Sequence, residues 1–262
     1  MASVWQFFSH EGDYADLNEV AACSRLARAL SIATVDGPTH DETDWAAFDE
    51  LGEFFRRSFP YVFEAAEVEK VDHSLMLTLH GQDASLDPIM FMGHMDVVPV
   101  VPGTEGDWEH GAFSGHVDDE YVWGRGALDM KDQVMGVLEA VEYALRHGWE
   151  FRRTLMLCLG QDEETLQSGA RAMGRLLERR GVRLHFVVDE GDYLVTDLAH
   201  LGAPGRHCMT VGLAEKGYAD VRLVVRSAGG HSSNPYGGTS LARLAKAIDR
   251  VASSPWPAEL IE

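Results

Sequence analysis

Four short segments of this sequence place acidic residues, and in one case a histidine, at the ends of apolar runs. They are residues 93–96, 128–130, 162–164 and 188–190. One imidazole with several carboxylates and no thiolate is the ligand set of a hydrolytic metal centre, whereas structural zinc sites are usually rich in cysteine. The set suits zinc, cobalt or manganese, and it requires a fold that brings strand ends together at one place.

The order of apolar residues predicts strands that alternate with helices. Strands are expected over residues 73–79, 88–93, 120–124, 154–159 and 184–188, and helices over 16–31, 44–59, 134–145 and 168–180. The second helix is expected to end at Pro60. Continuously apolar strands are typical of the α/β class, with a mainly parallel sheet covered by helices on both faces. Functional residues of such sheets lie at the carboxyl ends of strands, which is where the acidic segments fall.

The pattern changes near residue 207. Strands are expected over residues 209–213 and 218–225, followed by a helix over 240–252. We therefore expect a catalytic domain over residues 1–207 and the beginning of a second domain over 208–262.

The charge of the chain excludes one class of partner. The sequence has 42 acidic and 22 basic residues and a net charge of −20. Nucleic acid is excluded because phosphate binding needs a basic face. Three scattered cysteines argue against a disulfide framework and for a reducing compartment. We expect a cytoplasmic protein without a membrane partner, because no signal peptide and no membrane-spanning apolar run is visible.

His94 and Asp96 are two residues apart, so on a strand their side chains would share one face. Asp96 could bind the far ring nitrogen of His94 and fix its tautomer, although a histidine at a strand end can also be an ordinary core residue. Asp129 follows a Gly-Arg-Gly loop and could bridge two metal ions. It could also cap the helix that begins near Lys131, and both roles can hold at once.

Residues 162–164 are three consecutive acids beside a buried strand, and their repulsion is costly unless cations offset it. Glu164 would bind a metal ion, and Glu163 would take a proton from the water that the metal activates. The alternative is an exposed acidic turn. Of Asp189 and Glu190, one would be a metal ligand and the other would support it or contact the substrate. His231, flanked by glycine and serine, could simply be a polar loop tip.

At these segments the chain resembles the dinuclear zinc exopeptidase family that includes carboxypeptidase S, aminoacylase, acetylornithine deacetylase and succinyl-diaminopimelate desuccinylase. The matching segments are residues 93–100, 123–131, 162–164, 188–191 and 229–233, in the order and approximate spacing of the family. Residues 107–115 and 215–218 look most like the carboxypeptidase S branch.

The resemblance implies a role for each candidate residue. His94 and Asp189 would hold one zinc ion, Glu164 the other, and Asp129 would bridge the two. Glu163 would be the general base and Asp96 the partner of His94, and His231 would reach the substrate across a dimer. A cis peptide bond after Asp129 is also implied. The cofactors would be two zinc ions, with cobalt or manganese as substitutes.

The resemblance further implies hydrolysis of an amide bond next to a free carboxylate, in a short peptide or an N-acyl amino acid, by a homodimer formed through a lid domain. Two departures stand out. This chain stops inside the lid, before the segment that supplies the last histidine ligand in the family. Residues 165–168 also lack the glycine that relatives often carry. We therefore expect weak or no activity from the 262-residue form. The alternative is a non-catalytic fragment or interaction subunit that binds metal weakly.

Overall fold

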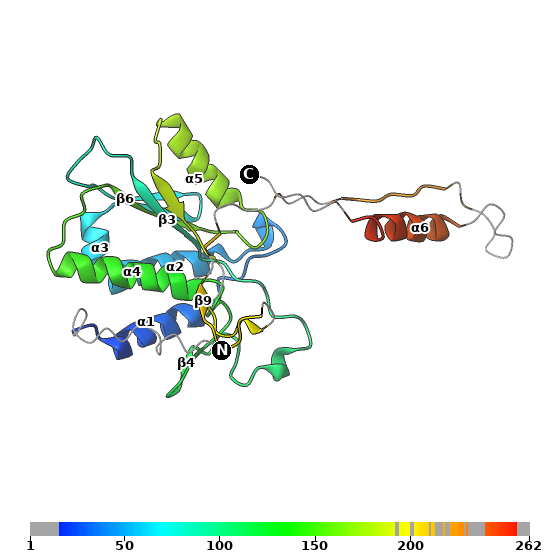
Figure 1. Cartoon of the computed structure of the whole chain (residues 1–262), viewed down its shortest axis with the longest axis horizontal. Coiled ribbons are helices and arrows are strands. Elements are labelled where there is room, and N and C mark those ends of the chain that lie inside the picture. Colours follow the sequence, from blue (N-terminus) through cyan, green and yellow to red (C-terminus); the bar gives the residue numbers. More distant parts are fainter. Residues whose placement is uncertain are drawn as a thin grey trace. The chain divides into compact units, whose positions relative to one another are not determined.

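The computed structural model describes residues 16–191, 194–199, 202–209, 211–212, 217, 221–227, 229 and 239–255. The chain divides into two compact units, residues 1–193 and 194–262. Figure 1 shows the ribbon of both units. This division falls before residue 207, where the sequence predicts a domain boundary. The assignment of a catalytic and a lid domain stays a prediction.

A five-stranded sheet forms the centre of the first unit, in the order β1-β2-β6-β3-β7. The strands are β1 (Glu67–Val71), β2 (Ser74–Leu79), β3 (Ile89–His94), β6 (Leu155–Gly160) and β7 (Phe186–Val188). β3 runs parallel to both β6 and β7, whereas β2 is antiparallel to β1 and β6. The predicted α/β fold is confirmed. The sheet is mixed because the β1–β2 hairpin adds an antiparallel edge, and the sequence analysis did not predict β1.

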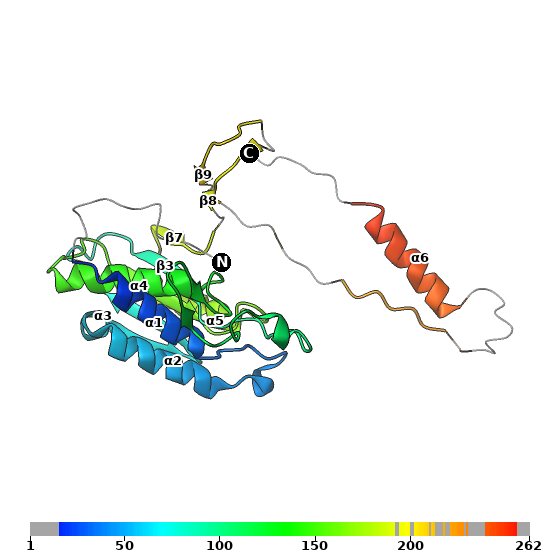
Figure 2. The ribbon, with the colours of Figure 1, turned by 90° about the horizontal axis from the view of Figure 1, so that it is seen from below.

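Four helices cover one face of this sheet, as Figure 2 shows from below. They are α1 (Glu19–Ser31), α2 (Trp45–Ser58), α3 (Pro60–Ala65) and α4 (Lys131–Arg146). α1 and α2 begin where Asn18 and Asp44 accept hydrogen bonds from backbone N–H groups of the first turn. The apolar stripe of α2, with Phe48, Leu51 and Phe55, is buried in the core between these helices and the sheet.

Pro60 ends one helix and begins another. α2 ends at Ser58, one residue before the predicted end, and Pro60 occupies the first turn of α3, where a missing N–H costs nothing. Between the two helices the side chain of Phe59 is fully buried. The turn therefore keeps the chain against the sheet, although the sequence pattern predicted only a helix end.

A single helix, α5 (Ser168–Arg179), covers the other face of the sheet in the described part of the chain. Its Met173 and Leu177 pack against a second apolar cluster that contains Met90, Met156 and Cys158 of β3 and β6. Burial raises the pKa of the Cys158 thiol to about 12. Both faces of the sheet are therefore covered along β2, β3 and β6, whereas the edge strand β7 is exposed.

Short elements complete the first unit. They are the 3-10 helices η1 (His40–Glu42) and η2 (Glu105–Asp107) and the antiparallel pair β4 (His116–Val117) and β5 (Val122–Trp123). β5 lies within the strand predicted over residues 120–124.

The second unit contains α6 (Ser240–Ala252), as predicted, and an antiparallel pair formed by β8 (Leu194–Val195) and β9 (Cys208–Met209). Among the described residues, the strand predictions for this unit are confirmed only at Met209 and are wrong elsewhere. Met209 lies in β9, but residues 211–212 and 221–225 are not in a strand. Residues 210, 213 and 218–220 lie outside the described part. An apolar run becomes a strand only when a neighbouring strand satisfies its backbone hydrogen bonds. Among the described residues, no helix has the length and apolar character that a membrane crossing requires.

Candidate metal centre

His94 is the last residue of β3 and is 2% exposed. Its Nδ1 lies 3.0 Å from the backbone oxygen of Asp96, and its Nε2 lies 3.0 Å from Oδ1 of Asp129. Nε2 also lies 3.9 Å from Oε2 of Glu190. One buried imidazole thus faces carboxylates that come from different segments.

The packing of α4 against β3 brings Asp129 to His94. A Cβ atom on Gly93 would lie 2.9 Å from Cγ2 of Val134, so glycine permits the close approach of strand and helix. Gly126 has a φ of +78° and its carbonyl accepts a hydrogen bond from the N–H of Lys131. The peptide bond between Asp129 and Met130 is cis, as the resemblance implies.

Asp96 connects His94 to the acidic loop. Its side chain is fully buried, and its carboxylate accepts hydrogen bonds from the backbone N–H groups of Glu163 at 3.1 Å and Glu164 at 3.0 Å. His94 Nδ1 lies 3.4 Å from the same carboxylate. One buried residue therefore orients the imidazole through its backbone oxygen and the acidic loop through its side chain.

The three consecutive acids have separate roles. The carboxylate of Asp162 is buried and accepts hydrogen bonds from the backbone N–H groups of Ser168 and Gly169, at the start of α5. A helix N-terminus stabilises such a negative charge. Glu163 accepts a hydrogen bond from the Gln167 amide at 3.1 Å. Asp162 thus anchors the loop, and the side chains of Glu163 and Glu164 are left for chemistry.

Three side chains of the centre have raised pKa values, and a bound cation could take the place of their protons. They are His94, Glu190 and Glu164. Burial lowers the pKa of His94, but the hydrogen bonds and charges of Asp96, Glu190 and Asp129 outweigh this and raise it to about 10. Burial raises the pKa of Glu190 to about 7. The His94 charge lowers this pKa, and the negative charges of Asp129, Glu163 and Asp189 raise it. Burial and the Asp129 charge also raise the pKa of Glu164. A divalent cation at the Nε2 side of His94 would take the place of a proton and relieve this repulsion.

The donor atoms fit such an ion. His94, Asp129 and Glu190 each offer one ligand atom, and the three atoms lie within 4.8 Å of one another. Imidazole nitrogens and carboxylate oxygens are both zinc donors, and catalytic zinc has three protein ligands, which is the number that this group offers. The hydrogen bond from Nδ1 to the Asp96 carbonyl is the outer contact that fixes the tautomer of a metal-binding histidine.

Glu190 occupies the place beside His94 that the resemblance assigns to Asp189. Asp189 instead accepts a hydrogen bond from the N–H of Glu190 at 2.9 Å and lines a cavity of about 290 Å³ together with His94 and Glu163. The ligand roles of Asp189 and Glu164 therefore stay predictions. The sequence offers two adjacent acids after β7, and their neighbours alone do not show which one faces the histidine. His231 lies outside the described residues.

Lys131 is a further residue that the sequence analysis did not assign to the site. Its side chain is 1% exposed, and its Nζ donates hydrogen bonds to the carbonyls of Ala29 at 3.0 Å and Ile32 at 2.8 Å, at the end of α1. Burial lowers the pKa of Lys131 to about 7, against the pull of Asp96. A lysine within an apolar helix face is the signal that could have revealed it. The Lys131 side chain attaches α1 to the segment that carries Asp129.

The sequence profile of the peptidase family M20/M25/M40 matches residues 90–255, which is more than half of the chain. The chain is 36% identical over 249 residues to the N-fatty-acyl-amino acid synthase/hydrolase of Mus musculus, covering 93% of this chain and 48% of that protein. It is 32% identical over 252 residues to carboxypeptidase S of Saccharomyces cerevisiae, covering 91% of this chain and 42% of that protein. The chain thus spans about half the length of these relatives.

Solved structures show the same fold at low sequence identity. Human carnosine dipeptidase 1 aligns with a TM-score of 0.54 and 22% identity, covering 70% of this chain and 41% of that chain. The metallo-carboxypeptidase Sso-CP2 of Sulfolobus solfataricus aligns with a TM-score of 0.52 and 20% identity, covering 66% and 38%. The family profile and the match to carboxypeptidase S confirm the predicted resemblance to the carboxypeptidase S branch.

Proposed function

This chain belongs to the peptidase M20 family, and we propose that it hydrolyses an amide bond next to a free carboxylate, in short peptides or N-acyl amino acids. The observation that carries the proposal is the group formed by His94, Asp129 and Glu190, with Asp96 orienting both the imidazole and the acidic loop. The names of the relatives, which include a carboxypeptidase and an N-fatty-acyl-amino acid hydrolase, support this substrate class.

The proposed cofactor is zinc, held by His94, Asp129 and Glu190, with Glu164 available for a second ion. When bound, the metal supplies a Lewis acid that polarises the scissile carbonyl and makes a water molecule more acidic. A cytoplasmic location and a homodimer that brings His231 to the substrate are further parts of the proposal.

Glu163 is the proposed general base. Its side chain lines the same cavity as His94, and the Gln167 amide holds one of its oxygens in place. From there Glu163 would accept a proton from the attacking water and return it to the leaving amine. The backbone of Glu163 is fixed by Asp96, so the position of the base is coupled to that of the histidine.

Arg171 is the proposed contact for the substrate carboxylate. It is the one cationic arginine or lysine side chain among the described residues that line this cavity. Its place in the first turn of α5 gives it access from solvent, since Arg171 is exposed. A guanidinium binds a carboxylate through paired hydrogen bonds, which would orient the amide toward Glu163.

The test compares the wild type, with and without zinc, and three variants on an N-acetyl amino acid and on its carboxamide. In a form of the protein extended to the length of its relatives, we expect the metal-free enzyme to be inactive and zinc to restore hydrolysis of the free acid. His94→Gln should abolish the activity, whereas His80→Gln, which changes an exposed histidine outside the site, should leave it unchanged. Arg171→Met should raise the KM for the free acid and not for the carboxamide. Equal hydrolysis by wild type and His94→Gln would refute the proposal.

A further inference from the structure

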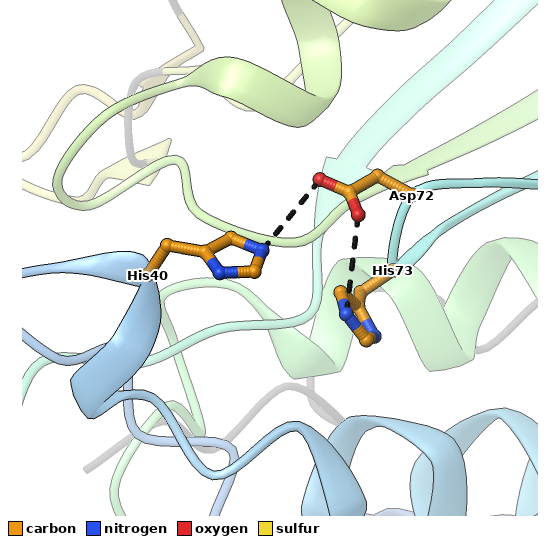
Figure 3. A group of neighbouring side chains, drawn as sticks. All are labelled: His40, Asp72 and His73. Carbon is orange, nitrogen blue, oxygen red and sulfur yellow. Dashed lines mark ion pairs between the residues drawn. The ribbon is translucent and has the colours of Figure 1, made fainter.

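Two histidines and an aspartate gather outside the acidic centre, at the turn between β1 and β2. Figure 3 shows Asp72 between the imidazoles of His40 and His73. Oδ2 of Asp72 lies 3.9 Å from Nε2 of His40, and Oδ1 lies 3.9 Å from Nε2 of His73. The three residues offer ligand atoms that all lie within 4.8 Å of one another. These separations are too long for hydrogen bonds, so the carboxylate does not already satisfy either ring.

The local structure fixes these side chains. Asp72 and His73 are the two residues of the hairpin turn, and Asp72 has a φ of +58°, a conformation that aspartate tolerates better than most residues. The ring of His73 stacks on Trp45, with centroids 4.2 Å apart. Trp45 also contacts the ring of His40 at 4.7 Å, and its Nε1 donates a hydrogen bond to the His40 carbonyl. One indole therefore positions both imidazoles.

A fully buried glutamine orients the carboxylate. Nε2 of Gln161 donates a hydrogen bond to Oδ2 of Asp72 at 3.0 Å, and its Oε1 accepts one from the N–H of His73 at 2.6 Å. Outer contacts of this kind hold metal ligands in place. Gln161 also directly precedes Asp162, so the turn is connected to the start of the acidic loop.

The group has unused binding capacity. Nε2 of His40 and Nε2 of His73 both face Asp72 at 3.9 Å, which leaves each nitrogen without a hydrogen bond to this carboxylate. No lysine or arginine of the described chain pairs with Asp72, and nearby Lys70 pairs with Asp49 instead.

We propose that His40, Asp72 and His73 form a second site, separate from the acidic centre, that binds a divalent transition metal, with zinc as the bound ion. Two imidazoles and one carboxylate select such ions over calcium or magnesium, which prefer oxygen ligands. Neighbouring ligands of tetrahedral zinc lie roughly 3.3 Å apart. The two separations between Asp72 and the histidines, 3.9 Å each, therefore need to close by roughly half an ångström, and the two imidazoles, whose ligand atoms lie within 4.8 Å of each other, need to approach as well. The side chains of His40 and Asp72 are 50% and 48% exposed, which leaves an entry path and room for water as a fourth ligand.

Calorimetric titration of the metal-free full chain with Zn²⁺ would test this site. We expect His40→Gln to bind one ion fewer than wild type, or to bind that ion at least about 100-fold more weakly. Asp72→Asn should weaken the same ion about 10-fold or more while keeping the turn, because asparagine tolerates positive φ and can still accept from Gln161. His80→Gln is the matched control, since His80 lies at the other end of β2 and is 70% exposed.

A second measurement reports on the site directly. Co²⁺ bound between His40 and His73 would lie against Trp45 and quench its fluorescence, so Trp45→Phe should remove the quenched fraction while circular dichroism stays unchanged. Equal stoichiometry and affinity in wild type, His40→Gln and Asp72→Asn would overturn the proposal. Co²⁺ quenching of equal extent in wild type and Trp45→Phe would overturn it as well. Because His94 is intact in each variant, hydrolysis assays separate this outcome from a failure of the proposed function.

Discussion

Nδ1 of His94 lies 3.0 Å from the backbone oxygen of Asp96, two residues further along the chain. The oxygen comes from the backbone, so the carboxylate of Asp96 remains available for the N–H groups of Glu163 and Glu164. The imidazole and the acidic loop are therefore coupled through one buried side chain. Changes at Asp96 should affect metal binding although Asp96 does not itself face the ligand atoms.

Asp96→Asn should weaken both folding and metal binding. The backbone oxygen for His94 stays, but the amide nitrogen would face an N–H group of the acidic loop and leave it without an acceptor. We expect the free energy of unfolding to fall by about 1–3 kcal/mol and zinc affinity to fall about 10–100-fold. Urea unfolding and calorimetry measure these two effects. Asp44→Asn, at the exposed cap of α2, is the control and should change neither, since asparagine also caps helices.

In a form of the protein extended to the length of its relatives, Glu163→Gln should keep zinc affinity and lower hydrolysis about 10²–10⁴-fold. The amide resembles the carboxylate in shape but cannot accept the proton of the water. Steady-state kinetics and zinc titration on the same preparation measure the two properties. Glu164→Gln is the comparison and should lower metal affinity. If the two variants show the reverse pattern, the roles of the two glutamates are exchanged.

Glu190 and Asp189 can be distinguished by paired substitutions. Glu190→Gln removes the carboxylate that lies 3.9 Å from His94, so zinc affinity should fall at least about 10-fold. Asp189→Asn keeps an oxygen that can accept from the N–H of Glu190 and should leave the affinity nearly unchanged. Loss of zinc binding in Asp189→Asn alone would favour the ligand assignment implied by the family resemblance.

Asp132, in the first turn of α4, should make the metal-free protein less stable at neutral pH than at acidic pH. Burial, with a contribution from Asp129, raises its pKa to about 6 against the backbone hydrogen bonds of Gln133 and Asp132 itself. The native state then binds more protons than the unfolded state between pH of about 4 and about 6, so stability falls as the pH rises through this window. We expect Asp132→Asn to be more stable than wild type by up to about 3 kcal/mol at pH 7 and nearly equal to it at pH 4. Urea unfolding at both pH values measures this, and a constant difference would contradict the assignment.

Local sequence patterns were sufficient to identify which segments carry the chemistry. His94, the acids after β6 and those after β7 follow apolar runs, and a parallel arrangement places the ends of β3, β6 and β7 at one edge. The helix caps at Asn18 and Asp44 and the apolar stripe of α2 are local features in the same sense. They depend on residues a few positions apart, whose spacing is visible in the chain.

The sequence by itself determined the α/β class and the segments that end at the candidate metal centre, because strand and helix periodicity depends on near neighbours. Only the tertiary structure decided that Glu190 rather than Asp189 faces His94 and that Asp162 caps α5. It also brought His40 beside Asp72 and His73, more than thirty residues away in the chain. The physical reason is that the direction of a side chain at a strand end, and the contacts between distant turns, depend on packing against other elements.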